Sequence, residues 1–476
     1  MLFNSIDFVL FLLFVIVGYY LIPVLKGKKY FLLLTSYYYY LNWEPGFLFL
    51  LLLDTIISYS YGRISISNWF ENRKKIVTGI TISLLLLPLF LFKYLTFLNI
   101  VIFDVLTYLK IDVQVLPFQL LLPIGISFYT FQSIGYVMDV YKKKQIAESD
   151  ILDYALFIGF FPQISAGPIG RAPILLPQFK VKHDFEYDSF VVGLKMMLWG
   201  FFMKLVVGDR AGIYVDTIFS NYEHHSGLSL LLATFLYSIQ IYCDFAGYSL
   251  IAIGTGRLLG FRLQTNFERP YFALNMTDFW RRWHISLSTW FRDYLYIPLG
   301  GNRCGKWKNY RNILITFLIS GLWHGAAYTF IIWGFLHGIF QIVGKLSKSI
   351  QSKFYRLLML PDNSIGYKII NIILTFILAS YAWMIFRAGT LENVIGITKG
   401  YFRSGSLYVH QTTLFFFFIG FIFLLLKDLK DEYFPEKHYF LYSEYLCIRY
   451  LSTLLLICMI VLFGVLDGGQ FIYFQF

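Results

Sequence analysis

The sequence predicts an all-α integral membrane protein that crosses the membrane many times. Hydrophobic residues make up 58% of the 476-residue chain and charged residues only 14%, whereas a soluble domain has roughly 25% charged residues. Apolar runs follow one another along the whole sequence and are separated by short polar connections. Phe and Tyr are abundant, at 51 and 37 residues, as expected for aromatic belts at membrane surfaces and for aromatic-lined cavities.

The apolar runs define the expected membrane segments, since a spanning helix needs about 20 apolar residues. The candidate runs cover residues 6–25, 30–42, 46–61, 76–98, 115–140, 151–170, 189–219, 228–260, 312–342, 367–387, 412–426 and 447–466. We expect roughly 11–13 membrane segments, with a partial helix at 100–109, in one membrane domain that covers residues 1–476. The first run has no basic segment before it and no cleavage site, which indicates a retained span.

Glycine and proline interrupt several of these runs, at Leu122–Gly125, Phe161–Pro162 and Ser165–Gly170. Broken helices at membrane depth are tolerated where they are buried in protein or line a wet cavity. Each break alone is explained by a kink that improves packing. Together with the polar Gln132 and Asp244, the breaks predict a central cavity.

The net charge of +12 comes mainly from basic residues in short connections, where they set topology and contact anionic lipid head groups. We therefore expect membrane lipids, and no nucleic acid, as partners. Basic residues follow the first, third and fifth spans and precede the last one, which predicts that both termini lie outside. The four cysteines form no CxxC pair and no histidine pair has ligand spacing with a carboxylate, so no metal is predicted.

The stretch from Asn266 to Gly338 holds the residues that point to chemistry. His324 lies in a hydrophobic run, and a buried neutral imidazole can take a proton from a hydroxyl, a role that contributes about 10²–10⁴-fold. The alternative is a hydrogen bond to a neighbouring helix. The adjacent Gly321 and Gly325 leave room for a substrate or for another backbone to approach the ring.

His284 is the second candidate, in a segment with too many charged residues for a plain span. The alternative for this segment is an interfacial amphipathic helix with tryptophan anchors. His337 is expected to be structural, in the same long helix as His324. Asp244 is costly in an apolar run unless it is paired, so we expect an arginine of the central stretch or a substrate as its partner.

Arginines crowd the central stretch, including Arg281, Arg282 and Arg292. The positive-inside bias explains such a cluster. A phosphate-rich donor held at the cytoplasmic face would need the same residues, because Arg pairs well with phosphate.

The motifs Asn266–Tyr271, Trp280–Gly301 and Ser320–Gly325 resemble those of the membrane-bound O-acyltransferase family, in the branch of the alginate O-acetylation membrane proteins. The resemblance implies a ring of helices around a thin centre pierced by a tunnel, with a core at about residues 119–338. It also implies that His324 is the catalytic residue and His284 the second active-site residue. As candidates for substrate binding we take Gln132, Asp244, Asn266, Trp280, Arg281, Arg282, Trp283, Arg292, Asp293, Ser320 and Trp323.

The resemblance further implies acetyl-CoA as the cytoplasmic acyl donor and the bacterial cytoplasmic (inner) membrane as the location. The acetyl group would end on a polysaccharide outside, of the alginate, peptidoglycan or cellulose type. A separate extracytoplasmic acetyltransferase of the SGNH type is implied as a partner. Three alternatives remain open: D-alanyl transfer to teichoic acid, acyl transfer to a lipid, and a non-catalytic transporter.

The C-terminal tail, residues 467–476, ends in Phe-Ile-Tyr-Phe-Gln-Phe. It resembles the aromatic C-terminal motif of the small protein that works with teichoic-acid D-alanylation transferases. This resemblance implies that Tyr473 carries the acyl group at the outer mouth of the tunnel. The alternative is an aromatic anchor at the membrane surface.

Overall fold

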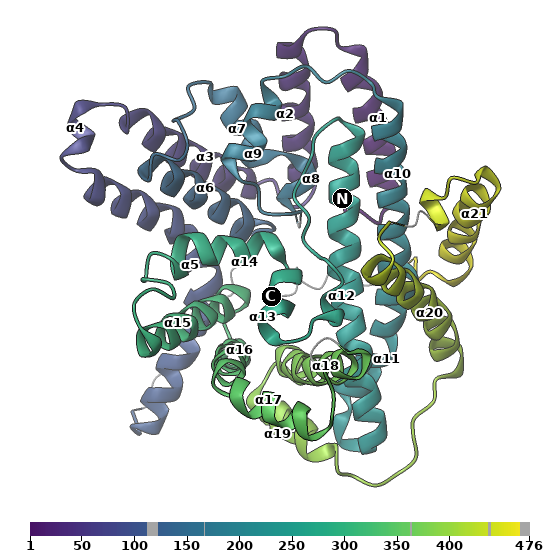
Figure 1. Cartoon of the computed structure of the whole chain (residues 1–476). Helices are drawn as coiled ribbons and strands as arrows, with labels where there is room; N and C mark the ends of the chain where they lie inside the picture. The colour runs from purple at the N-terminus through teal and green to yellow at the C-terminus, as the bar shows by residue number, and fades with distance from the viewer. Residues whose placement is uncertain (112–121, 166, 362–363, 437–438, 467–476) are drawn as a thin grey trace. The chain divides into compact units, whose positions relative to one another are not determined.

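A computed structural model describes residues 1–111, 122–165, 167–361, 364–436 and 439–466. Every regular element within these ranges is a helix, so the predicted all-α fold is confirmed (Figure 1). Eight of the described helices are long and apolar enough to cross a membrane. The chain is therefore a multi-pass membrane protein.

The described residues form two compact units. Unit 1 comprises Met1–Leu194 and Ala252–Gln264, and unit 2 comprises Lys195–Ile251 and Thr265–Phe476. The prediction of a single membrane domain stays a prediction. The tail with Tyr473 lies outside the described residues.

Unit 1 is built from the N-terminal helices. They are α1 (Ile6–Leu21), α2 (Leu25–Leu41), α3 (Phe47–Ile64), α4 (Asn68–Glu71), α5 (Lys74–Tyr108), α6 (Ile126–Tyr141), α7 (Ile151–Gly159), α8 (Phe161–Ile164) and α9 (Ala172–Phe179). The runs 76–98 and 100–109 belong to one continuous helix, α5, although it contains Pro88. Two further helices, α10 (Tyr187–Phe201) and α12 (Gly227–Leu258), contribute residues to both units.

The predicted breaks in unit 1 are present in the structure. Helix α6 begins directly after Gly125, whose φ of 75° is a left-handed conformation that glycine adopts at little cost. Helix α7 ends at Gly159 and α8 begins at Phe161. The side chain of Gln132 donates to the carbonyl of Phe157 near this break, so its amide stabilises the interrupted backbone.

Unit 2 contains the remaining helices, drawn in teal to yellow in Figure 1. They are η1 (Phe202–Gly208), α11 (Asp209–Ser220), η2 (Tyr222–His224), η3 (Pro270–Phe272), α13 (Met276–Arg282), α14 (Ile285–Phe291), η4 (Arg292–Tyr296), α15 (Lys306–His324), α16 (Tyr328–Leu346), α17 (Lys348–Leu357), α18 (Ile365–Arg387), α19 (Leu391–Gly400), α20 (Gln411–Tyr433), η5 (Phe440–Tyr442) and α21 (Leu446–Phe463).

The apolar run 312–342 is a helical hairpin, so the prediction that His324 and His337 share one helix is wrong. Helix α15 ends at His324, and α16 begins at Tyr328. A Cβ at Gly321 would collide with the carbonyl of Phe330, and one at Gly334 with the carbonyl of Phe317. The glycine spacing therefore serves close approach of two helix backbones. Of the two possibilities for Gly321, another backbone is the one observed.

A π-helix, η1, interrupts the run 189–219. It carries Lys204, which is 1% exposed, and the amine lies 2.7 Å from Asp209 and 2.5 Å from Asp244. A Cβ on Gly247 of α12 would contact the backbone nitrogen of Lys204 at 3.0 Å. This buried ion cluster, made of Lys204, Asp209 and Asp244, joins α12 to the π-helix. Lys204 is thus a partner of Asp244 that the sequence pattern did not identify.

Candidate active site

Helix α13 contributes the first residues of the site. The position of its N-cap, Asn275, sets the direction of each α13 side chain. The side chain of Asn275 accepts a hydrogen bond from Asp278 N at 2.9 Å, which satisfies one of the unpaired amides at the helix start. From this fixed start, Trp280 and Arg281 line a cavity. Arg282 instead forms ion pairs with Asp278 at 3.1 Å and with Glu432 of α20 at 2.9 Å.

The pKa of Arg282 reflects these bonds. Burial acts to lower that pKa, but the hydrogen bonds with Glu432 and Asp278 outweigh burial and raise it. The two neighbouring arginines of the central motif therefore differ in role. Arg282 stabilises the fold, and Arg281 faces the cavity.

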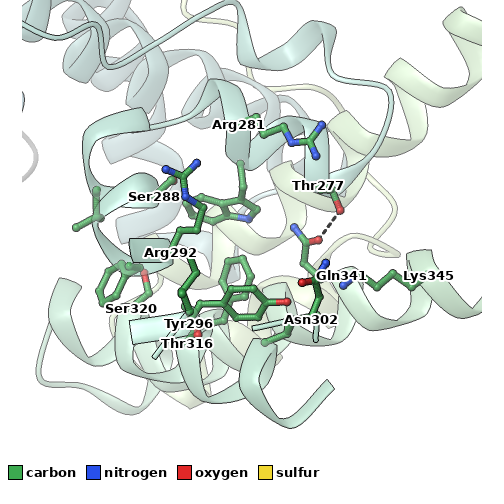
Figure 2. A pocket seen from close by; sticks show the side chains of 16 residues that line it. Thr277, Arg281, Ser288, Arg292, Tyr296, Asn302, Thr316, Ser320, Gln341 and Lys345 are labelled. Carbon is green, nitrogen blue, oxygen red and sulfur yellow. Dashed lines mark hydrogen bonds between the residues drawn. The ribbon is translucent and has the colours of Figure 1, made fainter. Parts of the chain in front are cut away.

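The cavity has a volume of about 500 Å³ and lies between α13, α14, η4, α15 and α16 (Figure 2). Its lining consists of Thr277, Trp280, Arg281, Leu287, Ser288, Phe291, Arg292, Tyr296, Ile297, Asn302, Ile313, Thr316, Phe317, Ser320, Gln341 and Lys345. Seven of these sixteen residues are apolar or aromatic, and three are cations. Such a site accepts a ligand with an apolar portion and a negatively charged portion.

The three cations differ in how they are balanced. Arg292 forms an ion pair with Asp293 at 2.8 Å. Within the described ranges, neither Arg281 nor Lys345 forms an ion pair with a carboxylate. Arg281 and Lys345 are therefore basic side chains at the cavity that no described carboxylate pairs with.

Gln341 and Lys345 are cavity residues that the sequence analysis missed. Together with His337 they recur every four residues on α16, so they lie on one face of that helix. Thr277 donates to the Gln341 carbonyl oxygen at 2.6 Å, as Figure 2 shows. The polar spacing in an otherwise apolar run was the signal that could have identified this face.

Trp280 forms the inner wall of the cavity. Its indole Nε1 donates to Nδ1 of His337 at 3.3 Å, and its ring lies 5.7 Å from that of Trp333. His337 is fully buried. The expectation that His337 is structural agrees with this bond, which holds the orientation of Trp280.

His324 lies behind this wall and does not line the cavity. Its side chain is 4% exposed, and its ring centroid is 4.9 Å from Trp323, 4.9 Å from Trp333 and 5.4 Å from Phe386. Ser320, which does line the cavity, precedes His324 by four residues on α15 and so lies on the same helix face. The cavity thus ends about one helical turn from the imidazole.

His284 also lies near Trp323. Its ring centroid is 6.1 Å from Trp323 and 4.6 Å from Phe245, and the residue is 1% exposed. Burial lowers the pKa of His284 to about 3, so this imidazole is neutral at pH 7. Both histidines therefore lie among aromatic rings, and Trp323 contacts each of them.

The remaining sequence candidates take different positions. Trp283 is buried against Trp383, with ring centroids 4.7 Å apart. Asn266 is 1% exposed and bonds to Ser286 and Ser249. Gln132 belongs to unit 1. The described residues contain no group of three or more His, Cys, Asp or Glu side chains that could hold a metal ion.

Fold and site define the class of protein first: a multi-pass helical membrane protein with imidazoles buried behind a cation-lined cavity. The model of the membrane-bound O-acyltransferase family matches residues 143–387. The chain belongs to this family and is an O-acyltransferase, which confirms the resemblance drawn from the motifs.

Named relatives support this assignment. The chain is 37% identical to the "Probable alginate O-acetylase AlgI" of Pseudomonas syringae pv. tomato, over 82% of this chain and 73% of the relative. It is 41% identical to the peptidoglycan O-acetyltransferase of Helicobacter pylori, over 59% of this chain and 57% of the relative. It is 29% identical to the teichoic acid D-alanyltransferase of Bacillus subtilis, over 79% of this chain and 96% of the relative.

Proposed function

We propose that the chain transfers an acetyl group from cytoplasmic acetyl-CoA across the membrane, for O-acetylation of a polysaccharide outside the cell membrane. The alginate and peptidoglycan O-acetyltransferases among the relatives support a polysaccharide as the final acceptor. Because coenzyme A is too charged to cross a bilayer, only the acyl group travels.

The cavity beside His324 carries this proposal. Arg281 and Lys345 supply positive charge for the phosphates of a donor, while the aromatic wall accepts its apolar arm. Ser320 continues the cavity wall toward His324. A thioester that enters from this cavity thus has its reactive end directed at the buried imidazole.

In the proposed reaction, the His324 imidazole takes the proton of an acceptor hydroxyl, whose oxygen attacks the thioester carbonyl carbon. A C–O bond forms, the C–S bond breaks, and the leaving thiolate receives the proton from His324. His284 orients the thioester, or its N–H stabilises the negative charge that develops on the carbonyl oxygen. An imidazole that stays neutral at pH 7 carries one N–H, the kind of donor that this role requires.

The space around His324 favours a short acyl group over a long one. Rings of Trp323, Trp333 and Phe386 surround the imidazole with centroids within 5.4 Å. A two-carbon acyl group adds little volume to this cluster, whereas a fatty acyl chain would displace several buried rings. This packing argues against transfer of a fatty acyl chain.

Beyond the membrane, the proposal includes a relay. A partner acetyltransferase of the SGNH type completes transfer to the polysaccharide, and Tyr473 in the outward-facing tail carries the acyl group to it. Arg292, Asp293 and Trp280 contribute to donor binding. Gln132 remains a candidate for contact with the acceptor, whereas the ion pair with Lys204 assigns Asp244 to the fold.

D-alanyl transfer to teichoic acid is the second candidate. The similarity to the Bacillus subtilis D-alanyltransferase extends over 96% of that relative. The two candidates differ in the donor, because a D-alanyl transferase takes its acyl group from a carrier protein. A reaction with acetyl-CoA alone therefore separates them.

The test uses the purified chain in lipid nanodiscs with radiolabelled acetyl-CoA. Free coenzyme A and protein-bound label are followed for wild type, His324→Ala, Tyr473→Phe and the control His224→Ala, which changes an exposed histidine. We expect His324→Ala to lower turnover by about 10²–10⁴-fold with unchanged folding, and His224→Ala to match wild type.

Label that requires both His324 and Tyr473 would support the relay. Turnover that requires His324 but not Tyr473 would keep the acetyltransferase proposal and move the carrier elsewhere. If wild type fails to react with acetyl-CoA but accepts D-alanine from a loaded carrier protein, the second candidate takes its place. Equal turnover of His324→Ala and wild type would contradict the proposed chemistry.

A further inference from the structure

The backbone of His284 has an unusual conformation. Its φ and ψ are 42° and 56°, in the left-handed region. This region is unfavourable for a residue with a Cβ, and such strain persists only where the surrounding structure holds it. His284 stands between the end of α13 and the first residue of α14, so the left-handed turn sets the direction of its side chain.

Backbone hydrogen bonds hold the chain on both sides of this turn. On one side, Glu268 N donates to the carbonyl of Arg282 at 3.0 Å. On the other, Ile285 N donates to the carbonyl of Asn266 at 2.9 Å. The segment around Asn266 is therefore hydrogen-bonded to the chain on both sides of His284.

The side chain of Asn266 adds a second set of bonds that an asparagine is suited to make. Its Oδ1 accepts from Ser286 Oγ at 2.6 Å and from Ser286 N at 3.3 Å. Its Nδ2 donates to Ser249 Oγ of α12 at 3.1 Å. One buried amide thus ties the start of α14 to α12, using both an acceptor and a donor.

The turn brings the His284 ring to the aromatic cluster. The ring lies against Phe245, four residues before Ser249 on the same face of α12. It faces Trp323, whose ring contacts His324. The bond between Asn266 and Ser249 therefore fixes α14 to the helix face against which the imidazole packs.

We propose that Asn266 is a positioning residue for His284: it enforces the left-handed turn and holds the imidazole in register with Trp323 and His324. Its catalytic consequence rests on the proposed acyl transfer. The sequence analysis placed Asn266 among the substrate-binding candidates. A side chain that is 1% exposed and bonds through both polar atoms acts through the fold instead.

The experiment combines turnover of acetyl-CoA with histidine labelling by diethyl pyrocarbonate, read residue by residue by mass spectrometry. The variants are Asn266→Ala and Ser286→Ala, which removes only the hydroxyl that bonds to Asn266. The matched control is Asn371→Ala, which removes a buried asparagine bonded to Tyr355 and Tyr367. Labelling of the fully buried His337 reports loosening of the whole unit.

We expect Asn266→Ala to lower kcat by about 100-fold, because the imidazole loses its fixed orientation, with the KM for acetyl-CoA within about twofold of wild type. Labelling of His284 rises by about tenfold while His337 stays protected. We expect Ser286→Ala to change kcat and His284 labelling in the same direction by smaller factors. This variant replaces Asn266→Ala in the test if Asn266→Ala does not fold. Asn371→Ala changes neither readout.

Two results would overturn the proposal. In the first, His284 and His337 become labelled together, which would make Asn266 a general stabilising residue. In the second, His284 stays protected in Ser286→Ala and Asn266→Ala. If wild type does not turn over acetyl-CoA, the proposed function fails, yet the labelling still decides whether Asn266 positions His284.

Discussion

Lys204 and His324 lie in the same unit, and both are almost completely buried, at 1% and 4% exposure. Lys204 is charged and has its counter-charges within 2.7 Å, on Asp209 and Asp244. His324 is surrounded by the rings of Trp323, Trp333 and Phe386. One region buries charge by pairing it, and the other buries a titratable group among aromatic side chains.

The comparison separates a charged group that stabilises the fold from the imidazole to which we assign the proposed chemistry. A charge in a low-dielectric interior is tolerated when an opposite charge is close, and the pair is then unavailable for chemistry. A neutral imidazole needs no counter-charge and keeps a nitrogen that can exchange a proton. The same contrast recurs at the neighbouring Arg281 and Arg282.

The largest expected effect comes from breaking the buried ion cluster. Replacing Lys204 with Met leaves two carboxylates buried without their cation, which costs about 3–5 kcal/mol. We expect a large drop in thermal stability in nanodiscs and poor recovery of folded protein. Fluorescence-detected unfolding and the yield after size-exclusion chromatography measure both.

Removing the opposing charges as well is the control. The combination of Lys204→Met, Asp209→Asn and Asp244→Asn carries no uncompensated charge and should regain most of the lost stability. A single Lys204→Met variant as stable as wild type would show that the cluster contributes nothing to the fold. The contrast with the histidine region would then fail.

Replacing the adjacent arginines should give effects of intermediate size. Arg281 should affect donor binding, and Arg282 should affect stability. We expect Arg281→Gln to raise the KM for acetyl-CoA about tenfold, because it removes a charge-assisted contact to phosphate. The KM for S-acetylpantetheine without phosphates should stay unchanged. Arg282→Gln should leave both KM values unchanged and lower the free energy of unfolding by about 1.5–3 kcal/mol, because Glu432 loses a partner. Equal effects of the two variants on KM would refute the separation.

The smallest expected effect concerns the strain stored at His284. Both His284→Ala and His284→Gly remove the imidazole and should lower turnover alike. Glycine relieves the left-handed strain, so His284→Gly should be more stable than His284→Ala by about 1 kcal/mol. Titration with sodium dodecyl sulfate compares the two. Equal stabilities would indicate that the turn is unstrained.

Much of the fold follows from where apolar runs begin and end. The run 228–260 predicts α12 closely, and the run 367–387 predicts α18, because charged or polar residues end each run. The reversal after His324 could not be predicted by the same rule. The turn consists of Gly325 and two alanines, which are as compatible with a helix in a membrane as with a bend.

The site was predictable at the level of motifs and less so at the level of side-chain direction. Trp280, Arg281, Arg292 and Ser320, which belong to the motifs, line the cavity, and their role in substrate binding stays a prediction. Which of Arg281 and Arg282 faces it depends on where Asn275 starts α13, and sequence does not fix a helix start to one residue. The role of Asn266 depends on backbone contacts between segments, which leave no residue pattern of their own.

The glycine contacts between α15 and α16 also bear on how the protein enters the membrane during synthesis. Helix α15 is absent from the eight described helices that are apolar enough to cross alone, whereas α16 is among them. The first turns of α15 carry Lys306, Lys308 and Arg311, which are costly for the translocon to release into lipid. Close backbone contact lets the later helix accompany the earlier one. The wall that α15 and α16 build together can therefore form only after the chain has been synthesised through Leu346.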